Sequence, residues 1–545
     1  MVSFPETAEY IVVLHVLMGI YGQAPSGADN CRKVNVEITM MAVEQEGSTE
    51  VGVSPRDAAN FPTAAPLAAE ILRGLAAVVG EGYLLTDIAE RALHAYDATI
   101  HRFLPDAVVR PANLPQVAAV LRLCQQTGVT VVPRGSATGL SGGALPVQGG
   151  VVLDLTRINR IREINVHDMY AIVETGVTVE HFSRAVAEHG LFFPPDPSAA
   201  RASTMGGGLA ENAGGPHAFK YGVFRDYTLG LTAVKMDGTV VRTGGKTVKN
   251  VSGYDLTRLL VGSEGTLAVI VEATMRLIAQ PKARRTLLMV YDRLDDAAQT
   301  VSEIIAAGMQ PAALEFIDDA SIRVVEQYLH LGLPLDAEAL LLVEVDGANT
   351  EVAEQTEQVQ QLCRKYGARS VTVAASEAEA AQLWKARKSI ASAVARIKPS
   401  KVSEDATVPR SQIPAMVRRL KEIARSYQVD LVIFGHAGDG NLHPNIMCDE
   451  SDPQEMERVW QAVAEIFAVT LELGGTLTGE HGVGTMKAPF MRWEHGEAGL
   501  AVMRAIKSAW DPDHLLNPGK IFPEEAPPWP IALDPWERRI TGKET

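Results

Sequence analysis

The fold is decided by the segment Pro133-Arg134-Gly135-Ser136-Ala137-Thr138-Gly139-Leu140-Ser141-Gly142-Gly143, which overlaps the end of the short apolar stretch 130–133. The apolar stretch predicts a buried strand. The glycines predict a turn at its end, because glycine lets the backbone curl and approach a ligand without Cβ clashes. Successive backbone N–H groups in such a turn form a concave anion site, and Arg134 and the loop hydroxyls can add hydrogen bonds to phosphate oxygens. Taken alone, the segment fits a glycine-rich surface loop equally well.

Three further segments place glycines beside hydroxyl or amide side chains, at 204–215, 249–255 and 262–270. Four such loops in one domain suit a long, extended ligand that carries a pyrophosphate. The fingerprints GxGxxG and GxxxxGK[ST] are absent from the sequence. The predicted scaffold therefore differs from both the Rossmann fold and the P-loop fold.

Apolar periodicity predicts the regular elements around these loops. Helices are expected near 67–78 and after Pro115, and strands at 151–155, 170–175 and 229–236, the last followed by the hairpin signal Asp237-Gly238. Past a boundary at 281–285, strands are expected at 286–291, 340–345 and 431–434 and helices near 296–308, 351–366 and 456–473. This alternation predicts an α+β second domain with helices packed on one sheet.

The expected domain limits follow from that pattern. They are an atypical extension at 1–63, a ligand-binding domain at 64–282, a second domain at 283–523 and a tail at 524–545. The extension is expected to be poorly ordered or to reflect a mis-assigned start, since Met40 and Met41 offer later starts.

Composition excludes several classes of protein. The formal net charge of −16 argues against nucleic acid as the main partner, because phosphate binding needs a clustered positive field. The four cysteines lie far apart without a CxxC pair, which predicts a reducing compartment and excludes a locally spaced four-cysteine iron–sulfur cluster. No run is long enough to span a membrane, so we do not expect an integral membrane protein.

Two segments of the second domain carry candidate chemistry, Gly435-His436-Ala437-Gly438-Asp439-Gly440-Asn441-Leu442-His443 and Gly479-Glu480-His481-Gly482-Val483-Gly484. Imidazole and carboxylate groups are suitable ligands for Zn²⁺ or Mn²⁺. His436, His443 and Glu480 would supply three ligands and leave positions open, as catalytic metal sites do. A hydrogen-bonded core histidine at a strand end is the structural alternative.

Taken together, these motifs resemble those of the FAD-dependent D-2-hydroxy acid dehydrogenase family, which includes the FAD-containing subunit of glycolate oxidase and D-lactate dehydrogenases. The likeness covers about residues 67–523. It implies an α+β fold: a two-subdomain FAD-binding domain of the vanillyl-alcohol oxidase and p-cresol methylhydroxylase type, followed by an FAD-linked oxidase C-terminal domain with an antiparallel sheet. Ala268 departs from the pattern, since relatives commonly have glycine there.

The resemblance implies that the 133–143 loop holds the FAD pyrophosphate and that 204–215 and 262–270 line the flavin. It also implies that the segment around Asn517 reaches back to the flavin. The implied FAD-binding residues are Pro133, Arg134, Gly135, Ser136, Ala137, Thr138, Gly139, Leu140, Ser141, Thr204, Gly206, Gly207, Ala210, Asn212, Gly214, Gly215, Glu264, Gly265, Ile270 and Asn517.

The implied reaction is oxidation of a small D-2-hydroxy acid, glycolate or D-lactate. The hydroxyl proton is poorly acidic, so the reaction needs a base, and His481 is the expected one. A divalent metal at His436, His443 and Glu480 would bind the hydroxyl and lower its pKa. Arg387, on a predicted helix, is expected to bind the substrate carboxylate, with a solvated helix face as the alternative.

Three alternative functions stay open at this stage. The first is oxidation of a larger acid such as 2-hydroxyglutarate, although Ser403 and Glu404 stand where such relatives have a lysine just before Asp405. The second is a non-catalytic FAD-binding accessory subunit, and the third is a metal-dependent hydrolase. The resemblance also implies iron–sulfur and second FAD-binding partner subunits, and a cytoplasmic location that allows peripheral attachment at the inner face of the membrane.

Overall fold

The computed structural model describes residues 67–523. Its first sheet contains the strand that leads into the first glycine-rich loop. The strands, in spatial order, are β1 (Leu84–Leu85), β2 (Ala107–Val109), β4 (Val151–Asp154) and β3 (Val131–Arg134). β2, β4 and β3 are parallel, and β1 is antiparallel to β2. Helices α3 (Ala69–Val79) and α5 (Leu114–Thr127) pack on this sheet through the apolar residues that the sequence periodicity singled out.

A second, antiparallel sheet follows along the chain. Its strands, in spatial order, are β5 (Ile161–Asn165), β6 (Tyr170–Glu174), β10 (Val269–Arg276), β8 (Thr228–Val234) and β9 (Val240–Gly244). β8 and β9 form the predicted hairpin, and Gly238 takes the positive φ of 79° that its turn requires. The helices of this region are α6 (Val179–Ala187), α7 (Met205–Glu211), α8 (Ala218–Tyr221), α9 (Phe224–Tyr227) and α10 (Leu256–Leu260).

The C-terminal part is built on an eight-stranded sheet. Seven of its strands follow the order β15 (Ala368–Val373), β12 (Ala283–Tyr291), β14 (Ala339–Gly347), β13 (Ala313–Asp318), β18 (Asp430–His436), β19 (Asn441–Cys448) and β16 (Ser400–Ser403). The eighth, β17 (Ala406–Thr407), also pairs with β19. Every one of these pairings is antiparallel.

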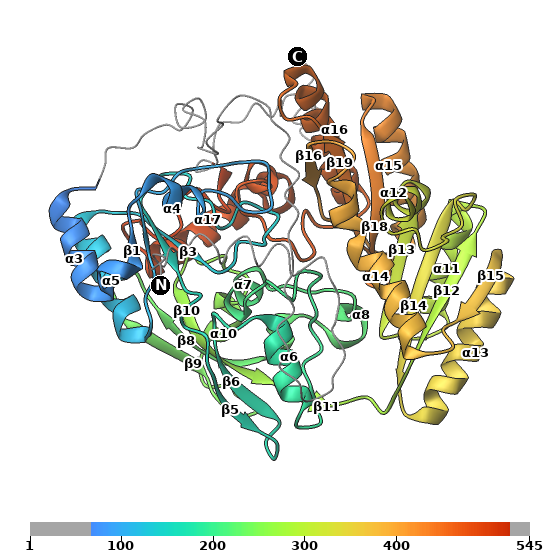
Figure 1. The fold of residues 1–545 in the computed structure, drawn as a ribbon, viewed down its shortest axis with the longest axis horizontal. Coiled ribbons are helices and arrows are strands. Elements are labelled where there is room, and N and C mark those ends of the chain that lie inside the picture. Colours follow the sequence, from blue (N-terminus) through green and yellow to red (C-terminus); the bar gives the residue numbers. More distant parts are fainter. Residues whose placement is uncertain (1–66, 524–545) are drawn as a thin grey trace, which may run out of the picture. The chain divides into compact units, whose positions relative to one another are not determined.

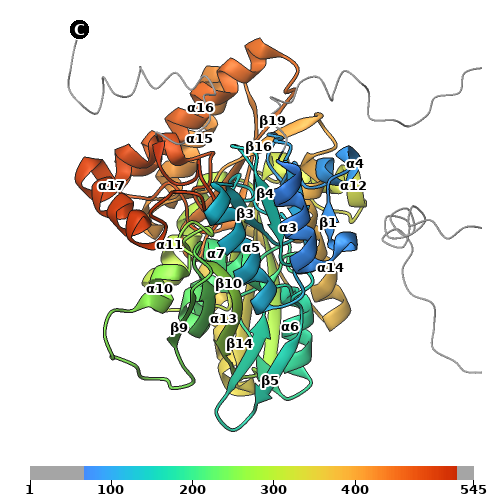
Figure 2. The same cartoon turned by 90° about the vertical axis from the view of Figure 1, so that its left-hand side faces the viewer.

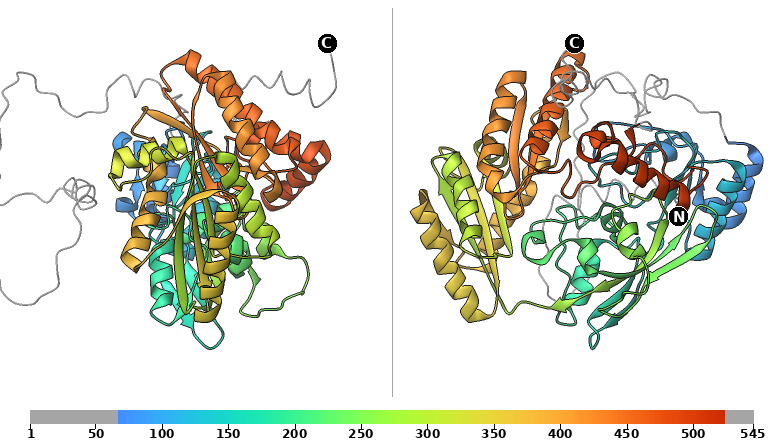
Figure 3. Two further views of the ribbon diagram at one scale, coloured as in Figure 1. Left: turned by 90° about the vertical axis from the view of Figure 1, so that its right-hand side faces the viewer. Right: turned by 180° about the vertical axis from the view of Figure 1, so that it is seen from behind.

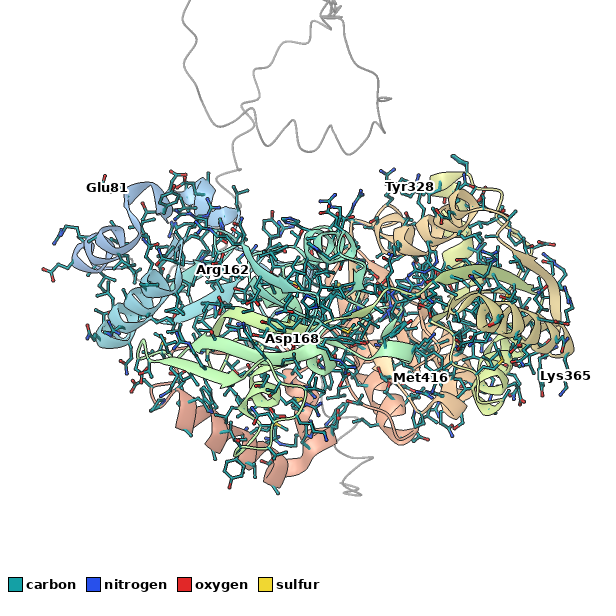
Figure 4. The ribbon with its side chains drawn as sticks, turned by 90° about the horizontal axis from the view of Figure 1, so that it is seen from below. Glu81, Arg162, Asp168, Tyr328, Lys365 and Met416 are labelled. Carbon is teal, nitrogen blue, oxygen red and sulfur yellow. The ribbon has the colours of Figure 1, made fainter. Side chains whose placement is uncertain are left out.

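Helices cover both faces of this sheet, because its strands alternate side chains between two apolar clusters. One face packs on α11 (Leu294–Ala306), α13 (Asn349–Lys365), α15 (Ile413–Tyr427) and α16 (Pro453–Glu472). The other packs on α12 (Asp319–Leu329) and α14 (Glu377–Val394). In Figure 4, Lys365 and Met416 mark the C-terminal part, and Glu81 and Arg162 mark the N-terminal part.

The chain ends by returning to the first sheet. Helix α17 (Met491–Trp510), which is kinked at Gly496, lies beside the N-terminal part (Figure 3). The segment after it pairs with β3: the Val131 N–H donates to the Leu515 carbonyl at 2.8 Å, and the Asn517 N–H donates to the Val131 carbonyl at 2.7 Å. The C-terminal residues thus complete the scaffold from which the 133–143 loop begins.

The short elements are η1 (Glu81–Tyr83), α4 (Ile88–Ala92), β7 (Leu191–Phe192) paired with β11 (Ile278–Ala279), η2 (Arg410–Gln412) and η3 (Ala488–Phe490). The predicted boundary at 282/283 falls between β11 and β12, and the domain limits themselves stay a prediction. The predicted extension at 1–63 and tail at 524–545 lie outside the described residues. Among the described residues, no helix is long and apolar enough to cross a membrane.

A buried ionic cluster joins the N-terminal part to β14. His217 Nδ1 lies 3.2 Å from Asp196 Oδ1, and His217 Nε2 lies 3.3 Å from Glu344 Oε1. Arg284 Nε and Trp384 Nε1 approach the same Glu344 carboxylate at 3.2 and 2.9 Å. Burial alone would lower the pKa of His217, but Asp196 and Glu344 raise it to about 10.

This cluster predicts a pH dependence of stability. Below the unfolded pKa of about 6.5, His217 is charged in both states and its stabilisation is fully present. As pH rises toward 10, only the folded state keeps the proton, so the free energy of unfolding falls by about 1.4 kcal/mol per pH unit. We expect His217→Asn to be less stable at pH 6 and to lack this component of the slope in urea denaturation between pH 6.5 and 10. The exposed His189→Asn serves as control, and a His217→Asn variant with the wild-type profile would contradict the ionised cluster.

Candidate active site

A cavity lined by both parts of the described chain brings the predicted loops together. The predicted FAD-binding residues that line it are Pro133, Arg134, Gly135, Ser136, Ala137, Thr138, Gly139, Leu140, Thr204, Gly206, Gly207, Ala210, Glu264, Gly265 and Ile270. Ala268, the departure from the family pattern, also lines it and is fully buried. Its methyl group is therefore accommodated at the cavity wall.

The first glycine-rich loop has the features of an anion cradle. Among the described residues, the backbone N–H groups of 136–141 have no hydrogen-bond acceptor in the protein. A Cβ built on Gly139 would meet only the Glu211 Oε1 atom, at 3.9 Å, so there is open space in front of this backbone. Free N–H groups facing open space at the end of a strand fit a bound pyrophosphate.

Five predicted FAD-binding residues do not line the cavity: Ser141, Asn212, Gly214, Gly215 and Asn517. The Asn517 side-chain amide donates to the carbonyls of Gly143 and Glu264, at 3.0 and 2.7 Å. The Ser141 carbonyl accepts from the N–H groups of Thr485 and Met486. These two residues therefore hold the lining loops together from behind.

The glycine-rich segment 249–255 does not line the cavity. It lies in the long connection between β9 and α10, which Figure 2 shows projecting from the N-terminal part. Val251 and Tyr254 are each 96% exposed. The expectation that this segment joins the ligand-binding loops is wrong, because the segment forms an exposed loop that does not line the cavity.

The candidate metal ligands His436 and His443 lie on adjacent strands. His436 is the last residue of β18, and His443 lies in β19 opposite Phe434. Only the turn 437–440 between them is irregular. Since Phe434 and His436 are two residues apart on one strand, both histidines share a sheet face, and their ring centres are 5.0 Å apart.

Glu480 brings a carboxylate between these rings. Its Oε1 atom lies 3.1 Å from His436 Nε2 and 3.3 Å from His443 Nε2. Ligand atoms of all three residues lie within 4.8 Å of one another. The donor set of two imidazoles and one carboxylate fits Zn²⁺ or Mn²⁺. His443 and Glu480 also line the cavity, so the cluster opens onto it.

Buried acids orient these histidines from the far side. Glu315 Oε1 lies 2.7 Å from His436 Nδ1, and Asp405 Oδ1 lies 3.6 Å from His443 Nδ1. Carboxylates in this position set the tautomer and orientation of metal-binding histidines. The Arg387 guanidinium lies 2.5 Å from Glu315 Oε2 and over the Phe434 ring. Burial raises the pKa of Glu315, but Arg387 and His436 hold it below its ordinary value.

Asp405 also fixes the loop that carries Glu480 and His481. Its Oδ2 atom accepts hydrogen bonds from the Thr478 hydroxyl at 2.7 Å and from the N–H groups of Gly479, Glu480 and His481 at 2.8 to 2.9 Å. Although burial raises the pKa of Asp405, the nearby His481 and Lys487 bring it far below its ordinary value. The carboxylate is therefore ionised and a strong acceptor.

His481 is held in a form that suits a base. It lines the cavity and stacks on His443, with ring centres 4.9 Å apart and planes inclined by 15°. Burial lowers its pKa to about 4, which keeps the imidazole neutral at physiological pH. A neutral imidazole has one ring nitrogen free to accept a proton.

The sequence interpretation missed several residues of the site. Glu315 was recognisable as a lone acid in the apolar run Leu314-Glu315-Phe316-Ile317. Asp405 had no such signal, because its partners begin 73 residues later in the chain. Lys401 and Asn445 line the cavity, but no local motif marked them, and Glu211 also lines it within the expected segment 204–215.

Residues 105–244 match the family described as "FAD binding domain", and residues 280–521 match "FAD linked oxidases, C-terminal domain". The chain is 49% identical over 439 residues to the glycolate oxidase subunit GlcD of Bacillus subtilis, covering 80% of this chain and 93% of that protein. It is 37% identical over 417 residues to the D-lactate dehydrogenase of Archaeoglobus fulgidus, covering 76% and 90%.

Solved structures agree with the fold. p-Cresol methylhydroxylase aligns with a TM-score of 0.71 at 16% identity, covering 83% of this chain and 96% of that one. 4-Ethylphenol oxidase from Gulosibacter chungangensis aligns with a TM-score of 0.68 at 18% identity, covering 84% and 97%. The α+β fold and the resemblance inferred from the sequence are thereby confirmed.

The role of Asp405 predicts a specific loss of stability. Asp405→Ala leaves four donors of residues 478–481 without their acceptor in a buried site. We expect it to lower the free energy of unfolding by about 3 kcal/mol or more, measured by urea denaturation. Glu422→Ala, which removes an exposed carboxylate from α15, should change it by less than about 0.5 kcal/mol. Equal stabilities of the two variants would show that Asp405 does not hold the loop.

Proposed function

Since this chain belongs to the FAD-linked oxidase family that includes the glycolate oxidase subunit GlcD, we propose that it oxidises a small D-2-hydroxy acid, glycolate or D-lactate, to the 2-oxo acid. One observation carries the proposal. The cavity lined by the FAD-binding loops is also lined by His443, Glu480 and His481. The flavin, which accepts the hydride, and the side chains that act on the substrate hydroxyl can thus contact the same substrate molecule.

The glycine-rich loop 133–143 is proposed to bind the FAD pyrophosphate through its free backbone N–H groups. Thr204, Gly206, Gly207, Ala210, Glu264, Gly265 and Ile270 are proposed to line the flavin. Ser141 and Asn517 support these loops from behind through their contacts with 485–486 and 143. When bound, FAD supplies a two-electron acceptor for the hydride from the substrate C2 atom.

His436, His443 and Glu480 are proposed to hold a divalent metal, Zn²⁺ or Mn²⁺. A metal at this position would lower the pKa of the substrate hydroxyl. Glu315 hydrogen-bonds His436 Nδ1, Asp405 Oδ1 lies 3.6 Å from His443 Nδ1, and the two Nε2 atoms face Glu480. The ligand geometry is thus set by the sheet before any ion binds.

His481 is proposed to take the hydroxyl proton on its unprotonated ring nitrogen. Its neutral state follows from burial, and the Asp405 carboxylate holds its backbone N–H. Arg387 was expected to bind the substrate carboxylate, and that role stays a prediction. Its guanidinium does not line the cavity, and its Nη2 atom is paired with Glu315.

Partners and location are also proposals. The matched relative is named as a subunit, which supports assembly with further subunits that accept the electrons. Among the described cysteines, Cys124, Cys363 and Cys448 are free and buried. Thiols kept reduced support a cytoplasmic location. Iron–sulfur and second FAD-binding subunits, and peripheral attachment to a membrane, rest on the resemblance alone.

The decisive experiment is an anaerobic absorbance titration of the purified FAD-loaded protein. We expect glycolate or D-lactate to bleach the flavin bands and L-lactate to leave them unchanged, because a chiral pocket presents only one C2 hydrogen to the flavin. D-2-hydroxyglutarate tests the larger substrate. Flavin bands that none of these acids bleaches would support the accessory-subunit reading.

Metal binding and proton transfer are separable by two variants. His443→Ala should lose the bound metal, measured by elemental analysis, together with flavin reduction. His481→Asn should keep the metal but slow flavin reduction by about 10²- to 10⁴-fold, the usual contribution of a general base. Retention of metal by His443→Ala, or fast reduction in His481→Asn, would refute the corresponding role.

A further inference from the structure

Glu211, the last residue of α7, and Glu264 bring two carboxyl groups to the same part of the cavity wall. The Glu264 N–H donates to the Ala210 carbonyl at 2.9 Å, which ties the backbones of the two acids together. A Cβ built on Gly482 would clash with Glu211 Oε2 and would lie 3.3 Å from Glu264 Oε1. Both carboxyl groups therefore lie against the same glycine, whose missing side chain leaves room for them.

The two carboxyl groups differ in their hydrogen bonds. Glu264 accepts from the N–H groups of Val483 and Gly484 at 2.7 and 2.6 Å. The Glu211 carboxyl accepts no hydrogen bond within the described part of the chain, and its Oε2 atom is buried. A buried carboxylate needs donors, whereas a protonated carboxyl group needs an acceptor for its own O–H. This difference favours a proton on Glu211 over a proton on Glu264.

The charges around Glu211 also favour its neutral form. Glu264 and Asp97 are the acids that act on it, and Lys487 is the opposing cation. The Lys487 ammonium donates to the Gly482 carbonyl at 3.0 Å and forms no ion pair with either glutamate in the described chain. Burial and the charge of Glu264 raise the pKa of Glu211 well above its ordinary value, and Lys487 offsets only part of this effect.

The ligand expected in the cavity adds to this preference. A Cβ built on Gly143 would lie 2.9 Å from Glu211 Oε1, so the carboxyl group lies against the loop whose N–H groups at 136–141 are free to bind an anion. The other titratable side chains that line the cavity in the described chain are Arg134, Lys401, His443, Glu480 and His481. An ionised Glu211 would repel a pyrophosphate held by the loop, whereas a protonated Glu211 offers an O–H donor.

We propose that Glu211 is a neutral carboxylic acid in the FAD-loaded protein and donates a hydrogen bond to the flavin. This inference rests on the proposed function, in which Ala210 and Glu264, the neighbours of Glu211 in sequence and in space, line the flavin. Glu264 keeps the proton on Glu211, because two adjacent buried carboxyl groups do not both ionise readily. Reduction adds negative charge to the flavin, and a neutral Glu211 does not oppose it.

Infrared difference spectroscopy of the FAD-loaded protein tests this inference directly. Electrochemical reduction of the flavin perturbs the C=O stretch of a protonated carboxyl group that is hydrogen-bonded to it, and this band is separate from the bands of carboxylates. We expect the band in the wild-type protein, with a shift in D₂O, and its absence from Glu211→Gln. The exposed Glu422→Gln on α15 should keep the band. Urea denaturation curves like that of the wild type verify that the variants are folded.

The affinity of the apoprotein for FAD gives a second readout, which needs neither reduction nor turnover. Glu211→Gln should bind FAD within about threefold of the wild type, because glutamine is neutral, has the same shape and keeps a donor. Glu211→Ala should weaken binding by about tenfold, the loss expected for one hydrogen bond. Glu422→Gln should bind FAD as the wild type does.

The outcomes separate this inference from the proposed function. A wild-type protein that does not bind FAD, or whose flavin no 2-hydroxy acid reduces, would refute the function itself. A reducible wild-type protein without the protonated-carboxyl band, or with a band that persists in Glu211→Gln, would overturn only the assignment of Glu211. FAD binding that is about tenfold tighter in Glu211→Gln would also overturn it, since Glu211 would then be ionised beside the cofactor.

Discussion

Two buried carboxylates hold the loop 478–486 from opposite sides, and the rest of the site depends on that constraint. Asp405, from the C-terminal sheet, accepts from the N–H groups of residues 479–481. Glu264, from the N-terminal part, accepts from the N–H groups of Val483 and Gly484 at 2.7 and 2.6 Å. Because each carboxylate accepts hydrogen bonds from several N–H groups, the loop has little freedom. Glu480 and His481 are thereby fixed at the junction of the two parts.

Buried charged side chains also support the proposed metal ligands from behind. Arg387, Glu315 and His436 form a chain of buried contacts, each of which satisfies the charge of the next. Buried charges are costly unless paired, so such a chain contributes more to geometry than to stability. Its consequence is that His436 faces Glu480 with its Nε2 atom, the orientation that the proposed metal site needs.

The loops proposed to bind FAD are restrained in a similar way by the end of the chain. Asn517 ties the loops at 143 and 264 together, and the buried Lys520 ammonium donates to the Leu145 carbonyl at 2.7 Å. The C-terminal segment also pairs with β3, from which the first glycine-rich loop departs. The loops that line the cavity are therefore joined by hydrogen bonds to a C-terminal segment that is far from them in the sequence.

The sequence by itself determined the features that depend on near neighbours in the chain. The glycine-rich loop after β3, the Asp237-Gly238 hairpin and the amphipathic helices follow from local backbone preferences and apolar periodicity. The chemistry of His436, His443, Glu480 and His481 was likewise readable from residue type and glycine context. Those signals also identified the family.

Only the tertiary structure decided which of these groups meet. In the folded chain Arg387 pairs with Glu315, and Asp405 accepts hydrogen bonds from the loop at 478–481. Lys401 lines the cavity, and segment 249–255 is exposed. The tertiary structure also set both histidines on strands. The physical reason is that charge pairing and burial depend on partners brought together by the sheet, and local sequence patterns contain no information about residues 70 or more positions away.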